Sequence, residues 1–187
     1  AFSTDASQLA GVRSALPNPQ EHVILPDIIS KEPLAPAVRH GDDQWFDIVK
    51  WIAFGQIAAE EKGITAANVD ELAKSSKDPE VQRMQGTSDD LGGQLGLDKA
   101  WLVRTGKAVG NYAEMFDRNL GPDTPLGLSR GPNELWTKGV LQYSPPFREL
   151  RSDPPPAARS ARGRVAPRQE AAGWSTADLR ARSAGRA

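Results

Sequence analysis

The sequence predicts an α/β chain in which helices outnumber strands. Two short runs, 22–25 and 34–38, are rich in apolar residues and lie next to prolines, which is typical of short strands. Apolar residues at helical spacing over 42–63 and 98–120 predict two long helices. A change of composition near Leu150 predicts that the ordered part of the chain ends there.

Length, charge and residue types exclude several classes of protein. The chain has 187 residues and a formal net charge of −1, which fits one domain or two small ones and argues against a strongly basic nucleic-acid-binding protein. It contains no cysteine, which excludes disulfide bonds, thiolate catalysis and cysteine-ligated metals. No apolar run reaches about 18 residues, so we predict no transmembrane helix.

The charge is divided unevenly along the chain. Residues 1–150 carry a net charge of −6, whereas 151–187 carry eight arginines, no lysine and three acids, a net charge of +5. The large apolar residues of this second segment are Val165, Trp174 and Leu179. Three such side chains bury too little surface to offset the entropy of ordering the segment, so we expect 149–187 to be a disordered tail rich in Arg, Ala and Pro. The tail has no docking scaffold, so no nucleic-acid partner is expected.

The first expected element is a helix that follows an extended entry at the N-terminus. One apolar face is formed by residues at helical spacing, namely Leu9, Val12 and Leu16. Thr4 or Asp5 is positioned to cap this helix, and Pro17-Asn18-Pro19 ends it. Pro26 closes the first predicted strand, and Pro33 precedes the second.

The first long helix is expected to begin at Gly41-Asp42-Asp43 and to end at Gly63, because glycine is a frequent C-terminal cap. Its apolar positions include Trp45, Phe46, Ile48, Val49, Ile52 and Ile57. This wide stripe predicts that the helix is heavily buried. Short helices are expected before Lys74 and after Asp78.

A connector rich in Gly and Asp at 86–96 precedes the second long helix, which Asp98 is expected to cap. The apolar stripe of this helix comprises Trp101, Thr105, Ala108, Val109, Tyr112, Met115, Phe116 and Leu120. Gly121-Pro122-Asp123 ends it, and a short helix at 135–136 and an extended segment at 141–147 follow. We expect four tryptophans to pack in the core, namely Trp45, Trp51, Trp101 and Trp136.

No group of residues in the sequence predicts catalysis or metal binding. His22 and His40 lack partners at i+3 or i+4 and lie in no nucleophile motif. The glycines within 92–96 lack the spacing of a phosphate-binding loop. Glu60-Glu61 and Asp89-Asp90 are adjacent acids whose side chains diverge on a helix, so a solvated face is expected. We therefore expect no catalytic residue, no cofactor and no metal.

Asp5 is the acid with two distinct interpretations. It stands at the end of an extended segment and at the start of a helix, where a carboxylate can cap the helix. The same position in an open α/β sheet faces a ligand cleft, where the carboxylate can bind an ammonium group. The residues by themselves favour the cap and leave the ligand role open.

Several strings of the sequence, taken in order, resemble one family. They are 1–5, 9–13, 28–49, 110–112, 121–128 and 141–148. These strings resemble periplasmic amino-acid-binding proteins, the solute receptors of ABC transporters for polar L-amino acids, in the branch that binds amino acids generally or glutamate, glutamine, aspartate and asparagine. The resemblance covers residues 1 to about 148.

The resemblance implies a fold, a domain layout and one site residue. The implied fold is the C-terminal part of a two-lobed type 2 periplasmic-binding fold with an incomplete first lobe. Residues 1–33 would end lobe two, and 34–148 would return through the hinge into lobe one and add a helical extension. Asp5 matches the family's carboxylate that binds the ligand α-ammonium. The family's signal peptide and its arginine for the ligand α-carboxylate lie upstream of the matched part, so we expect a truncated chain that does not bind tightly alone.

The implied function is a non-enzymatic receptor in the periplasm that delivers an L-amino acid to a membrane permease. A second hypothesis is a helical interaction module whose basic tail binds an anionic partner. A third is an enzyme on the same fold, but the sequence supplies neither a nucleophile–base pair nor a metal-ligand set for it.

Overall fold

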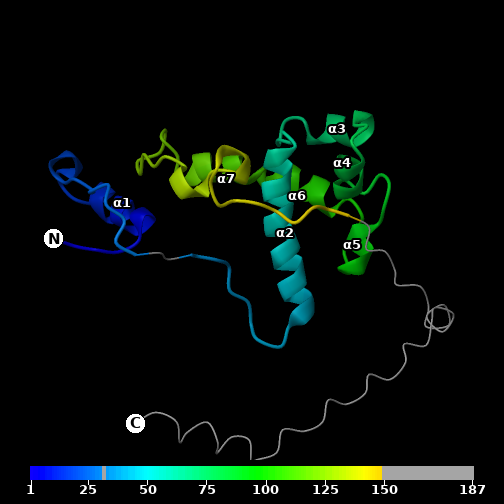
Figure 1. Cartoon of the computed structure of the whole chain (residues 1–187), viewed down its shortest axis with the longest axis horizontal. Coiled ribbons are helices and arrows are strands. Elements are labelled where there is room, and N and C mark those ends of the chain that lie inside the picture. The colour runs from blue at the N-terminus through cyan, green and yellow to red at the C-terminus, as the bar shows by residue number, and fades with distance from the viewer. Residues whose placement is uncertain (31–32, 149–187) are drawn as a thin grey trace, which may run out of the picture. The chain divides into compact units, whose positions relative to one another are not determined.

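The computed structural model describes residues 1–30 and 33–148, and the predicted tail at 149–187 lies outside these described residues. The described chain is helical (Figure 1). Its α-helices are α1 (Ala6–Ser14), α2 (Asp43–Glu61), α3 (Val69–Ser75), α4 (Pro79–Met84), α5 (Leu91–Gln94), α6 (Trp101–Val109) and α7 (Tyr112–Asn119). Its 3-10 helices are η1 (Pro19–Glu21), η2 (Gly131–Asn133) and η3 (Trp136–Lys138). None of the described helices is both long and apolar enough to cross a membrane.

The strands predicted at 22–25 and 34–38 do not form. Both runs are extended, but no residue of 23–30 or 33–41 makes a backbone hydrogen bond to another described residue. A strand exists only when a neighbouring strand accepts and donates its hydrogen bonds, and the described residues offer no such neighbour. The one β-bridge among the described residues is parallel and joins Leu135 to Gln142.

Helix α1 begins where the sequence predicts it, with Asp5 at the N-cap position. It ends at Ser14, before Pro17-Asn18-Pro19. Ala10 is its one buried residue, because the helix has little apolar surface and Val12 stays exposed.

Helix α2 has the predicted ends but not the predicted burial. The Asp42 carboxylate accepts a hydrogen bond from the Trp45 amide at 3.1 Å at the start, and Gly63 adopts φ 65° just beyond the end. Its buried residues are confined to the C-terminal half, at Gly55, Gln56, Ile57 and Ala58. In the first turn, Trp45 and Phe46 are 51% and 50% exposed, since the other helices pack against the later turns.

The second long helix predicted by the sequence is two helices, α6 and α7, which both contact α2 (Figure 1). The break lies at Gly110, whose φ of 78° is unfavourable for any side chain. Asn111 then caps α7 in a capping box with Glu114, and its Nδ2 donates to the Ile64 carbonyl at 2.8 Å. The apolar stripe continues across the break because both helices cover α2, so periodicity alone predicted one helix. Asp98 lies near its predicted place and accepts from the Ala100 amide, while Ala100 is the N-cap of α6.

The core forms where α3, α4, α6 and the later turns of α2 meet. Its buried residues are Ala58, Ile64, Val69, Val81, Met84, Trp101, Leu102 and Phe147. Of the four tryptophans expected in the core, Trp101 is buried in it and Trp51 is partly buried against it. Trp45 and Trp136 are half exposed. Phe147 comes from the extended segment 141–147, which therefore closes the core at the end of the described chain.

Candidate functional site

Asp5 lies at the junction between the extended N-terminal residues and α1. Its backbone carbonyl accepts the first helical hydrogen bond, from the Leu9 amide at 2.8 Å. Its carboxylate makes no capping hydrogen bond, although Asp5 occupies the N-cap position. The backbone of Asp5 thus starts the helix, and the side chain takes no part in capping it.

The Asp5 carboxylate has no hydrogen bond or ion pair to any other described residue, and the residue is half-buried. Its neighbour Thr4 bonds instead to Gln8 within the helix. A negative side chain next to the N-terminus of a helix is stabilised by the helix dipole. The Asp5 carboxylate therefore makes no contact that a cation would have to displace.

A shallow groove of about 460 Å³ lies near the other end of α1. Its lining residues are Arg13, Pro19, Gln20, His22, Val23 and Ile24. The groove does not include Asp5. His22 Nδ1 lies 3.0 Å from the Asn18 carbonyl oxygen, so this histidine stabilises the turn that follows α1. His40 is exposed in a turn before Gly41.

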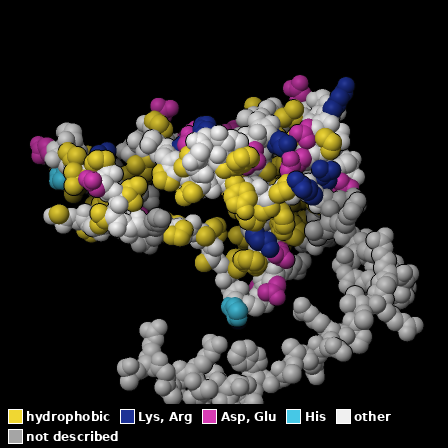
Figure 2. Space-filling view, viewed as in Figure 1, with side chains coloured by type: hydrophobic (Ala, Val, Ile, Leu, Met, Phe, Trp, Pro, Cys, Tyr) yellow, Lys and Arg dark blue, Asp and Glu magenta, His cyan; other side chains and the backbone are white. Residues whose placement is uncertain are grey.

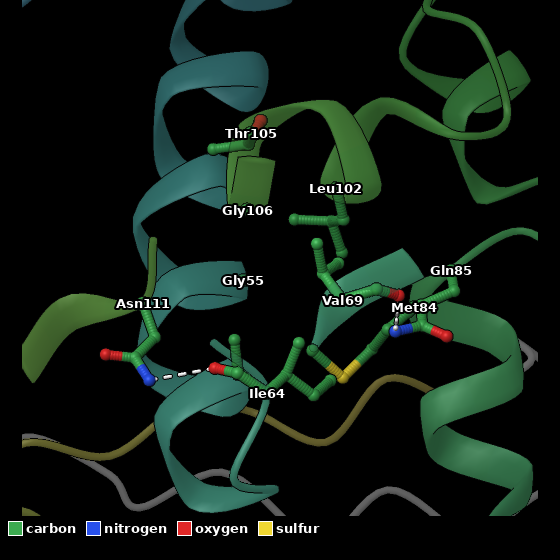
Figure 3. A pocket seen from close by; sticks show the side chains of 10 residues that line it. Gly55, Ile64, Val69, Met84, Gln85, Leu102, Thr105, Gly106 and Asn111 are labelled. Atoms are coloured by element: carbon green, nitrogen blue, oxygen red, sulfur yellow. Dashed lines mark hydrogen bonds between the residues drawn. The ribbon is translucent and has the colours of Figure 1, made fainter. Parts of the chain in front are cut away.

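A small cavity of about 20 Å³ lies in the helical part (Figure 3). It lies between α2, α3 and α6, with Gly55, Val69, Leu102 and Gly106 among its lining residues. Figure 3 shows the amides of Asn111 and Gln85 turned to backbone carbonyls, with Asn111 donating to Ile64 and Gln85 to Val69. Ligand pockets measure about 300–1,000 Å³, so this space holds a water molecule at most. The cavity is a packing void and not a binding site.

A largely buried ion pair joins α2 to the chain after α7, and no sequence pattern indicated it. Arg130 donates from Nη1 and Nη2 to the two carboxylate oxygens of Glu60, each at 3.0 Å, and both side chains are only 10% exposed. The guanidinium also lies 5.2 Å from the centre of the Tyr112 ring and 5.6 Å from that of Phe116. Glu60 was expected on a solvated face, but its side chain is largely covered because it pairs with Arg130, which lies 70 residues away in the sequence.

Tyr112 and Trp136 lie next to this ion pair and its neighbour Glu61. Burial, together with the Glu60 charge, raises the pKa of the Tyr112 hydroxyl, and the nearby Arg130 charge opposes this rise. Trp136 donates from Nε1 to the Glu61 carboxylate at 2.9 Å. The adjacent acids Glu60 and Glu61 thus hold the segment that contains η2 and η3. Neither the groove near α1 nor the cavity between α2, α3 and α6 is lined by these side chains, which contact one another.

A second ionic group fixes the segment that ends at Phe147. Lys62 pairs with Glu80 at 2.8 Å and with Asp78 at 3.0 Å. The Phe147 amide donates to Glu80 at 3.1 Å, and Arg83 Nε donates to the Phe147 carbonyl at 2.8 Å. The hydrogen bond to Glu80 is the main cause of a raised pKa for Lys62. The hydrogen bond from Lys62 is the main cause of a lowered pKa for Asp78.

The remaining candidates from the sequence have structural roles. Gly92 and Gly93 lie inside α5, where Asp90 accepts a hydrogen bond from the Gly93 amide at 2.8 Å. A Cβ on Gly92 would lie 2.3 Å from the Asp98 carbonyl oxygen, so this glycine permits a close approach of two backbone segments. Within residues 1–30 and 33–148, no three His, Cys, Asp or Glu side chains are grouped to hold a metal ion.

The chain is similar to periplasmic binding proteins. It is 55% identical over 149 residues to the general L-amino acid-binding periplasmic protein of Rhizobium johnstonii, a match that covers 79% of this chain and 43% of that protein. It is 52% identical over 147 residues to the glutamate/glutamine/aspartate/asparagine-binding protein of Rhodobacter capsulatus, covering 79% and 44%. These relatives are binding components and not enzymes. No family model matches the chain.

A solved structure agrees with these relatives. An ABC transporter periplasmic binding protein from Brucella ovis, with glutathione bound, is 52% identical and superimposes with a TM-score of 0.74 over 78% of this chain and 46% of its own. This match confirms the predicted fold class, part of a periplasmic-binding fold. The chain spans less than half the length of the relatives that it matches. Over 79% of its length, the chain is thus similar to periplasmic amino-acid-binding proteins of ABC transporters.

Proposed function

We propose that the chain supplies part of the substrate-binding component of an ABC transporter for polar L-amino acids. The observation that carries the proposal is the 55% identity over 149 residues to a general L-amino acid-binding periplasmic protein. The component would work in the periplasm and pass its ligand to a membrane permease.

The proposed ligand contact of this chain is the Asp5 carboxylate. It is half-buried and makes no capping hydrogen bond, so binding a ligand disrupts no contact that holds α1. A carboxylate binds an α-ammonium through short, charge-assisted hydrogen bonds, and these give orientation as well as affinity. Asp5 would therefore fix the ammonium end of the amino acid.

The proposed substrate class is glutamate, glutamine, aspartate and asparagine. The name of the Rhodobacter capsulatus relative supports this class. The glutathione in the Brucella ovis structure supports the same head group, because its γ-glutamyl end carries a free α-ammonium and α-carboxylate. A site that binds this head group can bind both a free amino acid and glutathione. The pocket for the rest of the ligand then sets the specificity.

The proposed layout assigns residues 1–33 to the end of lobe two and 34–148 to the return through the hinge into lobe one with its helical extension. Neither the groove near α1 nor the cavity in the helical part includes Asp5. A zwitterion bound at one end only leaves polar groups desolvated without partners, so we expect this chain by itself to bind amino acids weakly.

Calorimetric titration tests the proposal. The protein to titrate is this chain fused to the part of the Rhizobium johnstonii relative that it does not match, with Glu, Gln, Asp and Asn as ligands. We expect binding of at least one ligand and a loss of at least tenfold in affinity for Asp5→Ala. Asp27→Ala is the matched control, because Asp27 is an exposed acid of the same region. Absence of binding by all four ligands, or equal affinities for Asp5→Ala and Asp27→Ala, would overturn the proposal.

A further inference from the structure

Residues 143–147, which we call the closing segment, are extended and pass α2 near the end of the described chain (Figure 1). No backbone-to-backbone hydrogen bond joins them to another described residue, and two of the five are prolines, which lack an amide donor. Ser144 and Phe147 are buried, whereas Tyr143 is 61% exposed. The closing segment is therefore held by side-chain contacts and not by regular secondary structure.

The contacts that hold the closing segment are concentrated at Phe147. Its ring packs with its centre 5.4 Å from that of the Trp51 ring in α2. Its amide donates to Glu80 at 3.1 Å, and its carbonyl accepts from Arg83 Nε at 2.8 Å, both in α4. Glu80 is in turn paired with Lys62, and these two side chains are 23% and 28% exposed. Because ion pairs that water reaches contribute little stability, the attachment depends mainly on one residue.

The residues that precede the closing segment are held more firmly. Arg130 and Glu60 form a bidentate pair in which both side chains are only 10% exposed, so separating them leaves two poorly solvated charges. The Trp136 amide also donates to the Gln142 carbonyl at 2.8 Å. The chain up to Gln142 can therefore stay in place when the closing segment detaches.

The closing segment covers an edge of the hydrophobic core. Phe147 packs in one cluster with Val81 and Met84, and Trp51 packs against that cluster. Figure 2 shows hydrophobic side chains gathered over α2, the helix that the Phe147 ring contacts. A segment with few buried apolar contacts opens at a lower free energy than the whole fold. Such an opening here would uncover Trp51.

We propose that the closing segment is a latch that opens and closes on the helical core while the core stays folded. Opening breaks the two hydrogen bonds at Phe147 and separates its ring from that of Trp51, and it leaves the pair of Arg130 and Glu60 intact. The open form exposes apolar core surface and is therefore the form that associates with other molecules. The latch requires neither Asp5 nor a bound amino acid.

Cysteine labelling tests the latch, because the chain has no cysteine of its own. Ser144→Cys places a thiol in the closing segment at a position that is 8% exposed, and Val69→Cys places one in α3 at a position that is 2% exposed. Each full chain is treated with N-ethylmaleimide without denaturant. Each rate is divided by that of the same variant in urea, which removes differences in intrinsic reactivity. We expect the Ser144→Cys thiol to react at least tenfold faster, and equal rates would overturn the proposal.

A substitution in α4 shows whether the contacts at Phe147 hold the latch closed. Arg83→Ala removes the donor to the Phe147 carbonyl and should accelerate labelling of the Ser144→Cys thiol about tenfold, with no change for Val69→Cys. Arg104→Ala, at an exposed arginine of α6, should change neither rate. Equal acceleration of both thiols by Arg83→Ala would show that the closing segment opens only with the whole core, and would contradict the latch.

Hydrogen exchange of the unmodified chain gives a second measurement that needs no substitution. After correction for intrinsic rates, the Phe147 amide should exchange at least tenfold faster than the Trp136 amide, because the first is released by opening of the latch and the second is not. Equal protection of the two amides would contradict the proposal.

Discussion

The described chain contains two regions that differ in how far their apolar side chains are buried. In residues 43–147, helices α2, α3, α4 and α6 enclose a core, and side chains as large as Trp101 and Phe147 are buried. In residues 1–42, Ala10 is the one buried hydrophobic side chain. The difference follows from where helices and strands find the partners for their backbone hydrogen bonds. Helices make their hydrogen bonds internally and need only a face to pack, whereas strand-forming segments need a partner for their backbone.

The largest expected effect comes from replacing the same residue type in the two regions. Phe147 is 3% exposed and packs its ring 5.4 Å from that of Trp51, whereas Phe2 is 63% exposed. Phe147→Ala should lower the free energy of unfolding by about 3 kcal/mol, through lost burial and the cavity left behind. Phe2→Ala should change it by less than about 0.5 kcal/mol. Urea unfolding followed by circular dichroism measures both, and equal effects would contradict the division of the chain into two regions.

A second substitution tests the buried ion pair of the helical region. Glu60→Gln removes the charge that Arg130 faces and should cost about 3 kcal/mol of unfolding free energy, because a buried guanidinium loses its partner. Glu61→Gln is the matched control, since the amide oxygen can still accept from Trp136 and this hydrogen bond is exposed. Urea unfolding is again the measurement. A loss for Glu60→Gln no larger than that for Glu61→Gln would show that the pair does not hold the two segments together.

A third substitution tests the break between α6 and α7. Asn111→Ala removes the cap of α7 and the bond to the Ile64 carbonyl, which should cost about 2 kcal/mol. Asn119→Ala, at the exposed end of the same helix, should cost less than about 0.5 kcal/mol. Thermal unfolding of both variants gives the comparison, and the prediction is wrong if their melting temperatures agree.

The smallest expected effect is the pH dependence of the Lys62–Asp78 pair. The lowered pKa of Asp78 means that its ionised form stabilises the fold above the unfolded pKa of about 4, and that this contribution is lost as the pH falls through the lower folded pKa. The raised pKa of Lys62 means that its protonated form stabilises the fold below the unfolded pKa of about 10.4. This stabilisation is lost as the pH rises through the higher folded pKa.

Asp78→Asn isolates this contribution, because asparagine still caps α4. Both side chains are partly exposed, so the cost at pH 7 should be below about 1 kcal/mol. The cost should shrink when urea unfolding is repeated at a pH below the unfolded pKa of about 4. A difference from wild type that persists unchanged in acid would show that the carboxylate charge is not its source.

Local sequence signals predicted the helix ends well. Asp42 and Gly63 mark the ends of α2, and Asp78-Pro79 marks the start of α4, because capping and proline act within one turn. The break at Gly110 was missed because the apolar stripe runs through it. The strands at 22–25 and 34–38 were wrong for the described chain because pairing depends on residues that the sequence pattern does not show.

The candidate site was predicted less completely than the fold. The position of Asp5 at the start of α1 is confirmed, whereas its role toward a ligand stays a prediction. The Arg130–Glu60 pair was missed because its members lie 70 residues apart, a distance over which no local pattern operates. The functional prediction came from the resemblance to a family, because neither of the two pockets found among the described residues includes Asp5.

Hydrogen exchange of the full chain, without any partner, compares the two regions in one measurement. We predict that amides of α2, α6 and α7 exchange far more slowly than amides of 23–30 and 34–38, which should exchange at the rate of an unstructured peptide. Protection of 23–38 equal to that of α2 in the isolated monomer would contradict it, because the segment would then be folded without a partner.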